Sequence, residues 1–598
     1  MKRLLSGNEA IALGAWEAGV RFASAYPGTP STEILEALAQ YAGVRAEWAS
    51  NEKVALDAAA GAAFGGARAL AAMKHVGVNV AADSLMSLSY TGIKGGLVLV
   101  SADDPGCFSS QNEQDNRQYA RFGKFPCLEP SDSEEARQFT RLAFELSERF
   151  NCPVMLRSTT RLSHSKSAVD VEMPDAPRAF EPLPPFERHP DQYVIIPAIA
   201  RVRHPAIEQR LLDIAAWGET APVNRIEWGD RSIGVITCGM AYQYVREILA
   251  GYSFLKIGLV HPLPKELIRQ FAAQVERLVI AEELDPFIEE QVRAMGIDCI
   301  GKEVFPLVGE FTLARVRQAV RAAGLPAAEL PPAPKTEHLA VPPRPPALCP
   351  GCPHRAFFYN LRRWRRQMVF SGDIGCYSMG VLPPFDAMDM LISMGASIGM
   401  AHGLKQAGAQ EGVIAIIGDS TFFHAGLSPL ANAAYNNGCF ITAILDNRIT
   451  AMTGGQHHPG TGITLQGREG RPIDIAPLVR AMGIEHVREV DAWDVKAIND
   501  ALKEAMEVQT PAVLVVKGAC VFTPHFQRRP VVTVDAQVCT ACGTCFRVGC
   551  PAILKSDETH PKTGKHKATI DPLLCTGCTV CLQVCPVQAI YQTGGEED

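Results

Sequence analysis

The chain has 598 residues, enough for three or four domains at roughly 150 residues each. Hydrophobic residues make up 47% of it and charged residues 20%, which is ordinary for a globular protein with buried cores. The formal net charge is only −7 and no basic patch dominates, so nucleic acid is excluded as an expected partner. Because no run of 18 apolar residues occurs, no membrane span is expected.

The N-terminal stretch MKRLLSGNEAIALGAWEAG has the outline of an export signal, but its details favour a helix. Ser6 and Glu9 form an S-x-x-E capping box, and Glu17 interrupts the apolar positions. We therefore expect a helix here and a cytoplasmic protein. In that setting, the 18 cysteines of the chain favour metal binding over disulfides.

Residues 1–170 alternate between helical and strand patterns. Helices are expected over SGNEAIALGAWEAG, STEILEALAQYAG and NEKVALDAAAGAAFGGA, and strands over RFASAYPG, VRAEWAS, ALAAMKHVG and GLVLVSADDPG. This rhythm predicts a parallel sheet covered by helices on both faces. Such sheets bind ligands at the carboxyl ends of their strands, where AYPGTPST, SNEK, KHVGVN and SADDPG fall.

The remaining chain divides by composition. Residues 171–225 are proline-rich and predict an irregular linker that wraps a surface, and 226–330 return to an α/β pattern. A second proline-rich linker over 331–347 precedes a third α/β block over 348–530. The tail, 531–598, is dominated by eight cysteines, so the expected fold class is α/β with an added cysteine-rich domain.

The tail cysteines form two runs. The second, CTGCTVCLQVCP, is the C-x₂-C-x₂-C-x₃-C-P pattern of bacterial ferredoxins, in which the fourth cysteine ligates the other cluster. The first, CTACGTCFRVGCP, departs from it by one extra residue before its fourth cysteine. Zinc ribbons are the alternative, but they use C-x₂-C pairs rather than triplets. Crossed pairing predicts a first tail set, Cys539, Cys542, Cys545 and Cys585, and a second tail set, Cys550, Cys575, Cys578 and Cys581.

Oxygen-bearing side chains follow two strands of the third block. The strand VIAIIG runs into Gly418, Asp419 and Ser420, and the strand FITAILD runs into Asn447. A strand–helix–strand connection brings the two strand ends side by side, so a carboxylate and an amide oxygen converge. Such hard ligands suit Mg²⁺ beside a diphosphate. The alternative is that both residues only cap and turn at the strand ends.

Two further features are ambiguous on their own. Glu52 lies at a strand-to-helix junction, where the helix dipole alone favours a glutamate. In LCPGCPHR, Cys349 and Cys352 form a C-x₂-C step with His354 two residues on. Zinc on these three residues is cramped, and a redox dithiol should instead open a helix on a thioredoxin-like strand.

In combination, the motifs carry a family resemblance. Gly-Asp-Ser, followed by Asn after 26 residues, resembles the thiamine-diphosphate motif. Together with the tail and a set of shorter motifs, the whole chain resembles the large (α) subunits of indolepyruvate:ferredoxin oxidoreductases, within the thiamine-diphosphate-dependent 2-oxoacid:ferredoxin oxidoreductases. Those motifs are AYPGTPSTEI, NEKVALDAAAGAA, MKHVGVNVAADSLM, CPGCPHR, GDIGCYSMG and MGASIGMAHG.

The resemblance implies a role for each block. It makes 1–170 the pyrimidine-binding domain of a thiamine enzyme, 226–330 a transketolase-C-terminal-like domain, 348–530 the diphosphate- and Mg²⁺-binding domain, and 531–598 an α+β ferredoxin domain with two [4Fe–4S] clusters.

The resemblance also implies site residues. The side chains of Asp419 and Asn447 and the carbonyl of Ile449 would hold Mg²⁺, with Gly418 and Ser420 beside the diphosphate. Glu52 would activate the thiamine ring, and Thr29 would face the substrate. The loop SADDPG lacks the arginine with which pyruvate-using relatives bind the substrate carboxylate, and His75 is the candidate in its place.

A third cluster follows from the same family. Relatives hold a cluster near the thiamine ring on a C-x₂-C step, a cysteine about 25 residues on and a distant fourth cysteine. The matching residues, here called the proximal set, are Cys349, Cys352, Cys376 and Cys520. The alternative for Cys520 is a small apolar core residue, because free cysteines are often buried.

The implied reaction is oxidative decarboxylation of an aryl 2-oxoacid, such as indolepyruvate or phenylpyruvate. Coenzyme A would accept the acyl group to give an arylacetyl-CoA and CO₂, and ferredoxin would accept the electrons. A small β subunit is the implied partner, in an α₂β₂ assembly of heterodimers. The alternatives are a non-oxidative thiamine decarboxylase or carboligase, an oxidoreductase for another 2-oxoacid, and an electron-transfer subunit without catalysis.

Overall fold

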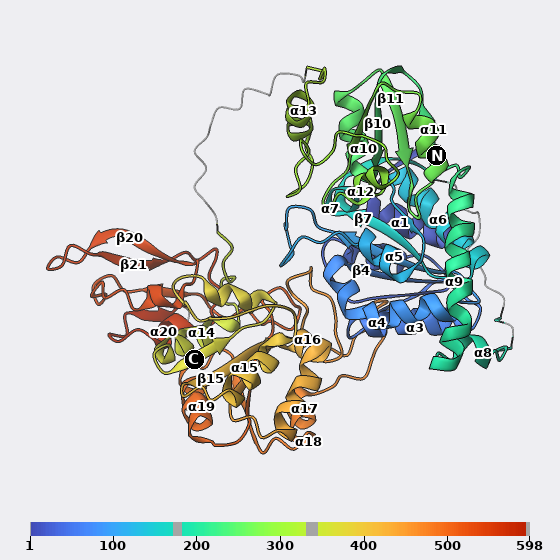
Figure 1. The fold of residues 1–598 in the computed structure, drawn as a ribbon. Helices are drawn as coiled ribbons and strands as arrows, with labels where there is room; N and C mark the ends of the chain where they lie inside the picture. Colours follow the sequence, from blue (N-terminus) through green and yellow to red (C-terminus); the bar gives the residue numbers. More distant parts are fainter. Residues whose placement is uncertain (1, 172–181, 184, 330–344, 594–598) are drawn as a thin grey trace. The chain divides into compact units, whose positions relative to one another are not determined.

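The computed structural model describes residues 2–171, 182–183, 185–329 and 345–593 (Figure 1). The chain divides into two compact units, Met1–Glu337 and His338–Asp598. We call them the N-terminal and C-terminal units. The division falls within the expected linker 331–347, most of which lies outside the described residues, as does part of the expected linker 171–225.

The N-terminal unit is built on a seven-stranded sheet with the order β12-β6-β7-β5-β4-β2-β3, parallel except for β12. Its strands are β2 (Phe22–Ala25), β3 (Arg45–Trp48), β4 (Ala69–Lys74), β5 (Leu97–Asp103), β6 (Cys127–Leu128), β7 (Val154–Thr159) and β12 (Leu259–His261). Its helices are α1 (Gly7–Glu17), α2 (Thr32–Leu38), α3 (Glu52–Phe64), α4 (His75–Thr91), α5 (Arg117–Gly123), α6 (Ser133–Phe150) and α7 (Thr160–His164). The predicted βα alternation and parallel sheet are confirmed.

The capping box at the start of the chain is also confirmed. The Ser6 hydroxyl accepts the N–H of Glu9, and the Glu9 carboxylate accepts the N–H of Ser6. Just before this helix, β1 (Lys2–Ser6) pairs with β8 (Lys166–Asp170). The N-terminal stretch is therefore an integral part of the fold.

The expectation of irregular chain across 171–225 is wrong for its second half. After the short α8 (Pro190–Tyr193), residues Pro197–Gly218 form α9, a helix of 22 residues that contains Pro205. Pro197 is the first residue of α9, and a proline there does not destabilise the helix, because the N–H that it lacks would have no intrahelical acceptor. The interior Pro205 is tolerated in a helix held by its partners: Arg203 and Arg210 donate to the carbonyls of Tyr90 and Ser89 in α4.

A smaller sheet with the order β13-β10-β11-β9 completes the N-terminal unit. Its strands are β9 (Arg225–Glu227), β10 (Asp230–Cys238), β11 (Tyr252–Ile257) and β13 (Arg277–Ala281), and its helices are α10 (Gly239–Ile248), α11 (Lys265–Ala272), α12 (Phe287–Ala294) and α13 (Leu313–Ala322). The α/β pattern expected for 226–330 is confirmed, although β12 from this stretch extends the first sheet instead.

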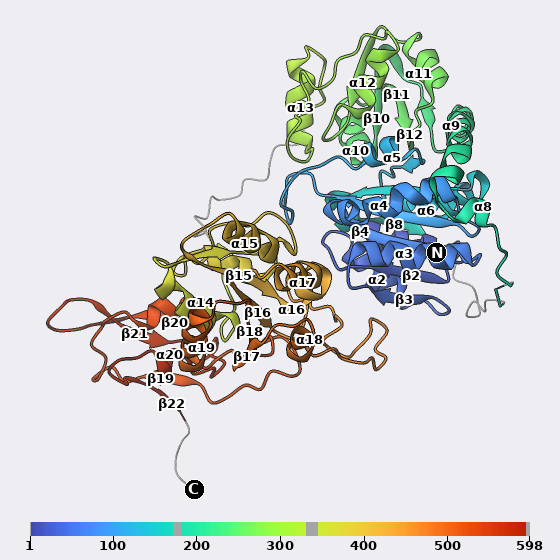
Figure 2. The ribbon, with the colours of Figure 1, turned by 60° about the horizontal axis from the view of Figure 1, so that its bottom comes forward.

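The C-terminal unit contains a fully parallel sheet with the order β14-β15-β16-β18-β17 (Figure 2). Its strands are β14 (Met368–Ser371), β15 (Gly412–Gly418), β16 (Ile441–Asp446), β17 (His486–Asp491) and β18 (Ala512–Lys517). Its helices are α14 (His354–Leu361), α15 (Ala396–Gln406), α16 (Asp419–Thr421), α17 (Leu427–Tyr435), α18 (Ile475–Ala481) and α19 (Val495–Glu507). Successive residues of β15 enter opposite cores, Ile414 and Ile416 on one face and Val413 and Ala415 on the other, as a doubly covered sheet requires.

The cysteine-rich tail carries two small ribbons, β19 (Val532–Val534) with β22 (Ile590–Gln592) and β20 (Ile553–Thr559) with β21 (His566–Ile570), and the short helix α20 (Val580–Gln583). It is packed into the C-terminal unit, because Val548 and Val580 share one hydrophobic core with Phe357 of α14. The extra residue in the first cysteine run is accommodated at Gly549, whose φ of +65° is the left-handed conformation that glycine adopts readily. A side chain there would also meet Pro384 and Phe385.

Candidate active site and cluster sites

The first candidate site lies at the carboxyl edge of the parallel sheet in the C-terminal unit. Strands β15 and β16 are parallel neighbours, with Gly418 opposite Leu445. Asp419 and Asn447 therefore follow two adjacent strand ends, as the sequence pattern predicts. Gly418 is required by close packing, because a Cβ atom there would lie 2.5 Å from the Tyr377 ring.

Asp419 is buried and held on both carboxylate oxygens. Its Oδ1 accepts the N–H of Ser420 at 2.8 Å, and its Oδ2 accepts the N–H of Arg448 at 2.8 Å. The His458 Nε2 lies 3.0 Å from Oδ2. Burial opposes ionisation of Asp419, but His458, the N–H of Ser420 and a hydrogen bond with Asp446 together outweigh it and lower the pKa of the carboxyl. Asp419 is therefore a fixed anion at the strand end.

A second carboxylate and an amide complete the oxygen cluster. Burial, with the neighbouring Asp419 charge, raises the pKa of Asp446 to about 7. The Asn447 Oδ1 accepts the N–H of Ile449 at 3.2 Å. Two buried carboxyl groups that repel each other beside an amide oxygen form a donor set that a hard divalent cation would satisfy, so the residues present fit Mg²⁺.

Several residues of this site carry no signal in the sequence. His458 comes 39 positions after Asp419, and no spacing rule connects the two. Asp373, which follows β14, accepts the N–H groups of Gly395 at 2.7 Å and Ser397 at 2.9 Å and so fixes the start of α15. The sequence feature that could have identified Asp373 is its position just after a strand, in SGDIG.

In the N-terminal unit, Glu52 is the first residue of α3 and only 6% exposed. The helix begins at Asn51, whose side chain accepts the N–H of Val54 at 2.9 Å. The α4 backbone approaches Glu52 at Gly77, where a Cβ atom would lie 2.7 Å from the Glu52 Cγ. Glycine at 77 thus leaves the space that the buried carboxyl occupies.

Thr29 and His75 lie at strand ends of the same sheet, but they differ in environment. The carbonyl of Thr29 accepts the Ser109 hydroxyl at 3.3 Å. The His75 side chain is fully buried at the start of α4, with Nε2 at 3.1 Å from the carbonyl oxygen of Asn112. His75 is therefore tied to the loop that follows β5.

Lys74, next to His75, is a residue that the sequence analysis missed. Its aliphatic carbons lie against Gly28, where a Cβ atom would be 3.3 Å away, and its Nζ donates to the Ser109 carbonyl at 2.8 Å. Burial lowers the pKa of Lys74, against the opposing charges of Asp104 and Glu52. A half-buried lysine at the end of β4 thus lies within electrostatic reach of Glu52.

The proximal set comes together as four neighbouring thiols of the C-terminal unit. Burial raises the pKa of Cys352 to about 12, with Cys376 and Cys349 adding to the rise. Burial likewise raises the pKa of Cys376 to about 11, with contributions from Cys520 and Cys349. His354 points elsewhere, with Nε2 at 3.5 Å from the Asn447 Nδ2.

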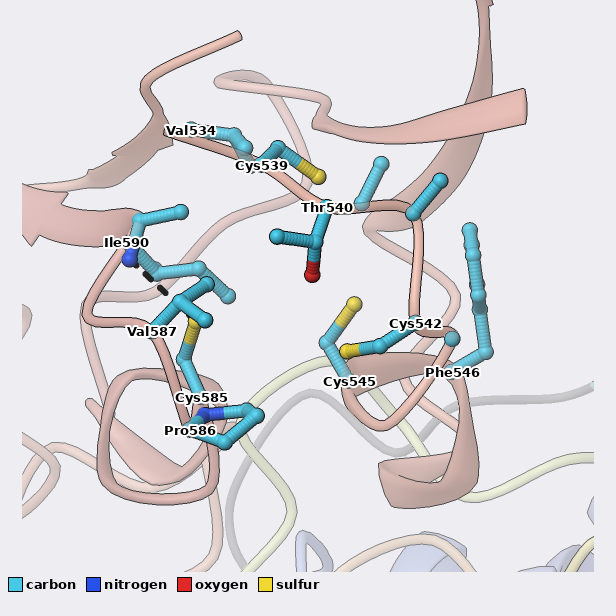
Figure 3. Close-up of a pocket in the computed structure, with 14 residues that line it drawn as sticks. Val534, Cys539, Thr540, Cys542, Cys545, Phe546, Cys585, Pro586, Val587 and Ile590 are labelled. Carbon is cyan, nitrogen blue, oxygen red and sulfur yellow. Dashed lines mark hydrogen bonds between the residues drawn. The ribbon is translucent and has the colours of Figure 1, made fainter. Parts of the chain in front are cut away.

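The first tail set surrounds one pocket. Cys539, Cys542, Cys545 and Cys585 all line it, together with apolar residues such as Val534, Phe546 and Ile590 (Figure 3). The four cysteines come from the two different runs, which is the arrangement that crossed pairing requires. Burial raises the pKa of Cys545 to about 11, with Cys542 and Cys539 adding to it.

The second tail set is joined in the same way. Burial raises the pKa of Cys581, and the thiols of Cys578, Cys550 and Cys575 add to the rise. Across the described ranges, no three or more His, Cys, Asp or Glu side chains surround a point closely enough for a single ion. A [4Fe–4S] cluster binds its four thiolate ligands on separate irons, so four cysteines that line one pocket, as in the first tail set, fit a cluster.

Comparison with known proteins agrees with a chain that has separate thiamine-diphosphate-binding and cluster-binding domains. Residues 13–212 match the pyruvate flavodoxin/ferredoxin oxidoreductase thiamine-diphosphate-binding family, 373–516 the C-terminal TPP-binding domain of thiamine pyrophosphate enzymes, and 538–589 the 4Fe-4S dicluster domain. Indolepyruvate oxidoreductase subunit IorA of Methanothermobacter thermautotrophicus is 42% identical over 99% of this chain and 98% of its own. The subunit of the same name from Pyrococcus horikoshii is 42% identical over 98% of this chain and 96% of its own.

The chain belongs to the indolepyruvate oxidoreductase subunit IorA family. It is an oxidoreductase with thiamine-diphosphate-binding domains and a 4Fe-4S dicluster domain. A more distant relative, 2-oxoglutarate synthase subunit KorA of Methanothermobacter marburgensis, is 26% identical over 51% of this chain and 94% of its own. None of the helices in the described residues is long and apolar enough to cross a membrane.

Proposed function

We propose that this IorA-family chain carries out the oxidative decarboxylation of an aryl 2-oxoacid and passes the electrons through three [4Fe–4S] clusters to ferredoxin. One observation carries the proposal. The N–H of Cys520, in the proximal set, donates at 3.0 Å to the carbonyl of Asn447, a proposed Mg²⁺ ligand. The residues for a thiamine cofactor and for a one-electron acceptor are thus joined by a single hydrogen bond.

The cofactor residues are proposed as follows. Asp419, Asn447 and the Ile449 carbonyl hold Mg²⁺, with Gly418 and Ser420 beside the diphosphate. The carboxyl of Glu52 supplies the proton that activates the ring. Thiamine diphosphate, when bound, supplies the nucleophilic carbon and the electron sink that decarboxylation of a 2-oxoacid needs.

For the substrate carboxylate, Lys74 is a better candidate than His75. The support is that Lys74 carries a charge beside Gly28 and Thr29 and makes no salt bridge with any described residue, whereas the His75 ring is buried against Asn112. In this proposal Thr29 faces the same substrate. The names of the relatives support indolepyruvate or a related aryl acid.

The partners in this reaction are also proposals. Coenzyme A accepts the acyl group to give an arylacetyl-CoA, and a small β subunit joins the chain in an α₂β₂ assembly. A non-oxidative decarboxylase or an oxidoreductase for another 2-oxoacid is the alternative.

The test is reduction of ferredoxin by the purified chain with its partner subunit, across a panel of 2-oxoacids with and without coenzyme A. Reduction that needs both an aryl 2-oxoacid and coenzyme A is expected. CO₂ release without ferredoxin reduction would reject the proposal.

A further inference from the structure

Arg355 is a buried cation that connects two of the cysteine sets. It is the second residue of α14 and is 1% exposed. One guanidinium nitrogen, Nη1, donates to the carbonyls of Val548 at 3.0 Å and of Gly549, the residue before Cys550. The other, Nη2, donates to the carbonyls of Leu348 and, at 2.8 Å, of Cys349. A single side chain therefore ties the chain of the proximal set to that of the second tail set.

The charge of Arg355 has no carboxylate partner among the described residues. The two fully buried arginines of the N-terminal unit differ in this respect, because Arg117 pairs with Asp115 and Glu282, and Arg157 pairs with Asp103 and Glu129. Burying a charge costs several kcal/mol unless an opposite charge lies nearby. The carbonyl groups around Arg355 accept from Nη1 and Nη2, while the buried Nε has no hydrogen-bond partner among the described residues. Carbonyl groups do not neutralise the charge, so an anion near this side chain would stabilise it.

The thiols of both sets are within electrostatic reach of this cation. Burial raises the pKa of both Cys352 and Cys578, and Arg355 acts against the rise in each case. The two sets also meet through their loops. A Cβ atom at Gly351, between Cys349 and Cys352, would lie 2.0 Å from the Thr576 Oγ1, between Cys575 and Cys578.

We propose that Arg355 is the shared counter-charge of the proximal and second tail clusters and raises the reduction potentials of both. The inference rests on the clusters of the proposed function. Four thiolates make each cluster anionic, and a one-electron reduction adds a further negative charge. A fixed cation stabilises the reduced form more than the oxidised form, and charge near a cluster is one of the factors that set its potential. When an electron passes from the proximal to the second tail cluster, one is oxidised and the other reduced beside the same cation.

The test is a redox titration of the full protein, monitored by electron paramagnetic resonance, in Arg355→Gln and Arg355→Lys. In Arg355→Gln, the midpoint potentials of the proximal and second tail clusters fall by at least 59 mV, which is a tenfold change in a one-electron equilibrium. The potential of the first tail cluster stays unchanged. Arg547→Gln is the matched control, because it removes an exposed arginine close to Cys545. Cysteine-to-serine variants assign each signal to its set.

Arg355→Lys keeps the positive charge but has fewer donors. It should give a smaller fall, confined to the same two clusters. In Arg355→Gln, three unchanged potentials, or the same shift in all three clusters, would overturn the proposal. If Arg355→Gln does not fold, either of these results in Arg355→Lys would overturn it. A shift in Arg355→Lys as large as in Arg355→Gln would assign the effect to structure instead of charge. A parent protein that binds no clusters would instead reject the proposed function, so the two failures are distinguishable.

Discussion

The backbone N–H of Cys520 donates to the carbonyl oxygen of Asn447 across 3.0 Å. Asn447 follows β16 and Cys520 follows the neighbouring β18, so the parallel register of these strands sets the contact. Through it, the proposed metal–diphosphate site and the proposed proximal cluster share one sheet edge. An electron acceptor beside the reacting centre is what an oxidoreductase needs and a simple decarboxylase does not.

Replacing Asp419 should separate the two kinds of cofactor. Asp419→Ala removes the fixed anion at the end of β15, so bound thiamine diphosphate should be lost while the iron content stays at the parent value. Thiamine and iron analysis of the purified variant measures both. Asp557→Ala, at an exposed position in the same unit, is the control and should change neither. Near-normal thiamine diphosphate in Asp419→Ala would rule out its role as a Mg²⁺ ligand.

Glu52→Gln should bind thiamine diphosphate but lose most of its turnover. General acid–base catalysis contributes about 10²–10⁴-fold, and the amide cannot exchange the proton. Steady-state kinetics together with cofactor analysis measure the two effects separately. Glu47→Gln in β3 replaces a nearby glutamate that has no proposed role. Activity within a few-fold of the parent in Glu52→Gln would remove Glu52 from the mechanism.

Lys74→Met should raise the KM for the 2-oxoacid by about tenfold to a hundredfold, because a hydrogen bond to a charged group contributes about 1.5–3 kcal/mol. Lys74→Arg keeps the charge and should recover part of the affinity. Lys53→Met, which removes a surface lysine paired with Asp57, is the control. If Lys74→Met leaves the KM unchanged and His75→Gln raises it, the carboxylate partner is His75.

Cys520→Ser should lower the iron content from about twelve to about eight atoms per chain, by the rule of four cysteines for each cluster. Cys439→Ser tests the effect of losing any half-buried thiol in this unit and should leave the iron content unchanged. Full iron occupancy in Cys520→Ser, with three intact cluster signals, would show that Cys520 is only a core residue.

Much of this site could be predicted from local sequence, because local rules create it. The cysteine runs fix their ligands by spacing, and the strand–helix–strand order brings Asp419 and Asn447 to one edge without any tertiary information. The roles of His458 and Arg355 could not be predicted, since Asp419 lies 39 positions from His458 and the carbonyl of Val548 lies 193 positions from Arg355. The helix α9 was missed because Pro205 argues against a helix locally, while its contacts with α4 are tertiary.

Glu283 predicts a pH dependence of stability in the N-terminal unit. Burial raises the pKa of this carboxyl to about 7, although it accepts the N–H of Phe311 at 2.6 Å. Since the folded state holds the proton more tightly than the unfolded state, the free energy of unfolding should fall as the pH rises from about 4.5 to 7 and stay low above that range. The full effect is on the order of 3 kcal/mol.

Glu283→Gln should remove this decline, because glutamine keeps an acceptor for Phe311 and carries no charge. Thermal unfolding midpoints of the N-terminal transition, measured between pH 4.5 and 8, test it, with the exposed Glu290→Gln as control. A parent whose midpoint rises across this range, or a variant that follows the same decline as the parent, would contradict the expectation.

The most direct test of the central claim is a single anaerobic mixing experiment. The purified protein, loaded with thiamine diphosphate, Mg²⁺ and clusters, is mixed with indolepyruvate and no ferredoxin, and frozen samples are examined by electron paramagnetic resonance. Reduced-cluster signals should appear as CO₂ is released, and Glu52→Gln should give neither the signals nor CO₂. Release of CO₂ with all three clusters still oxidised would contradict the claim that this chain couples decarboxylation to electron transfer.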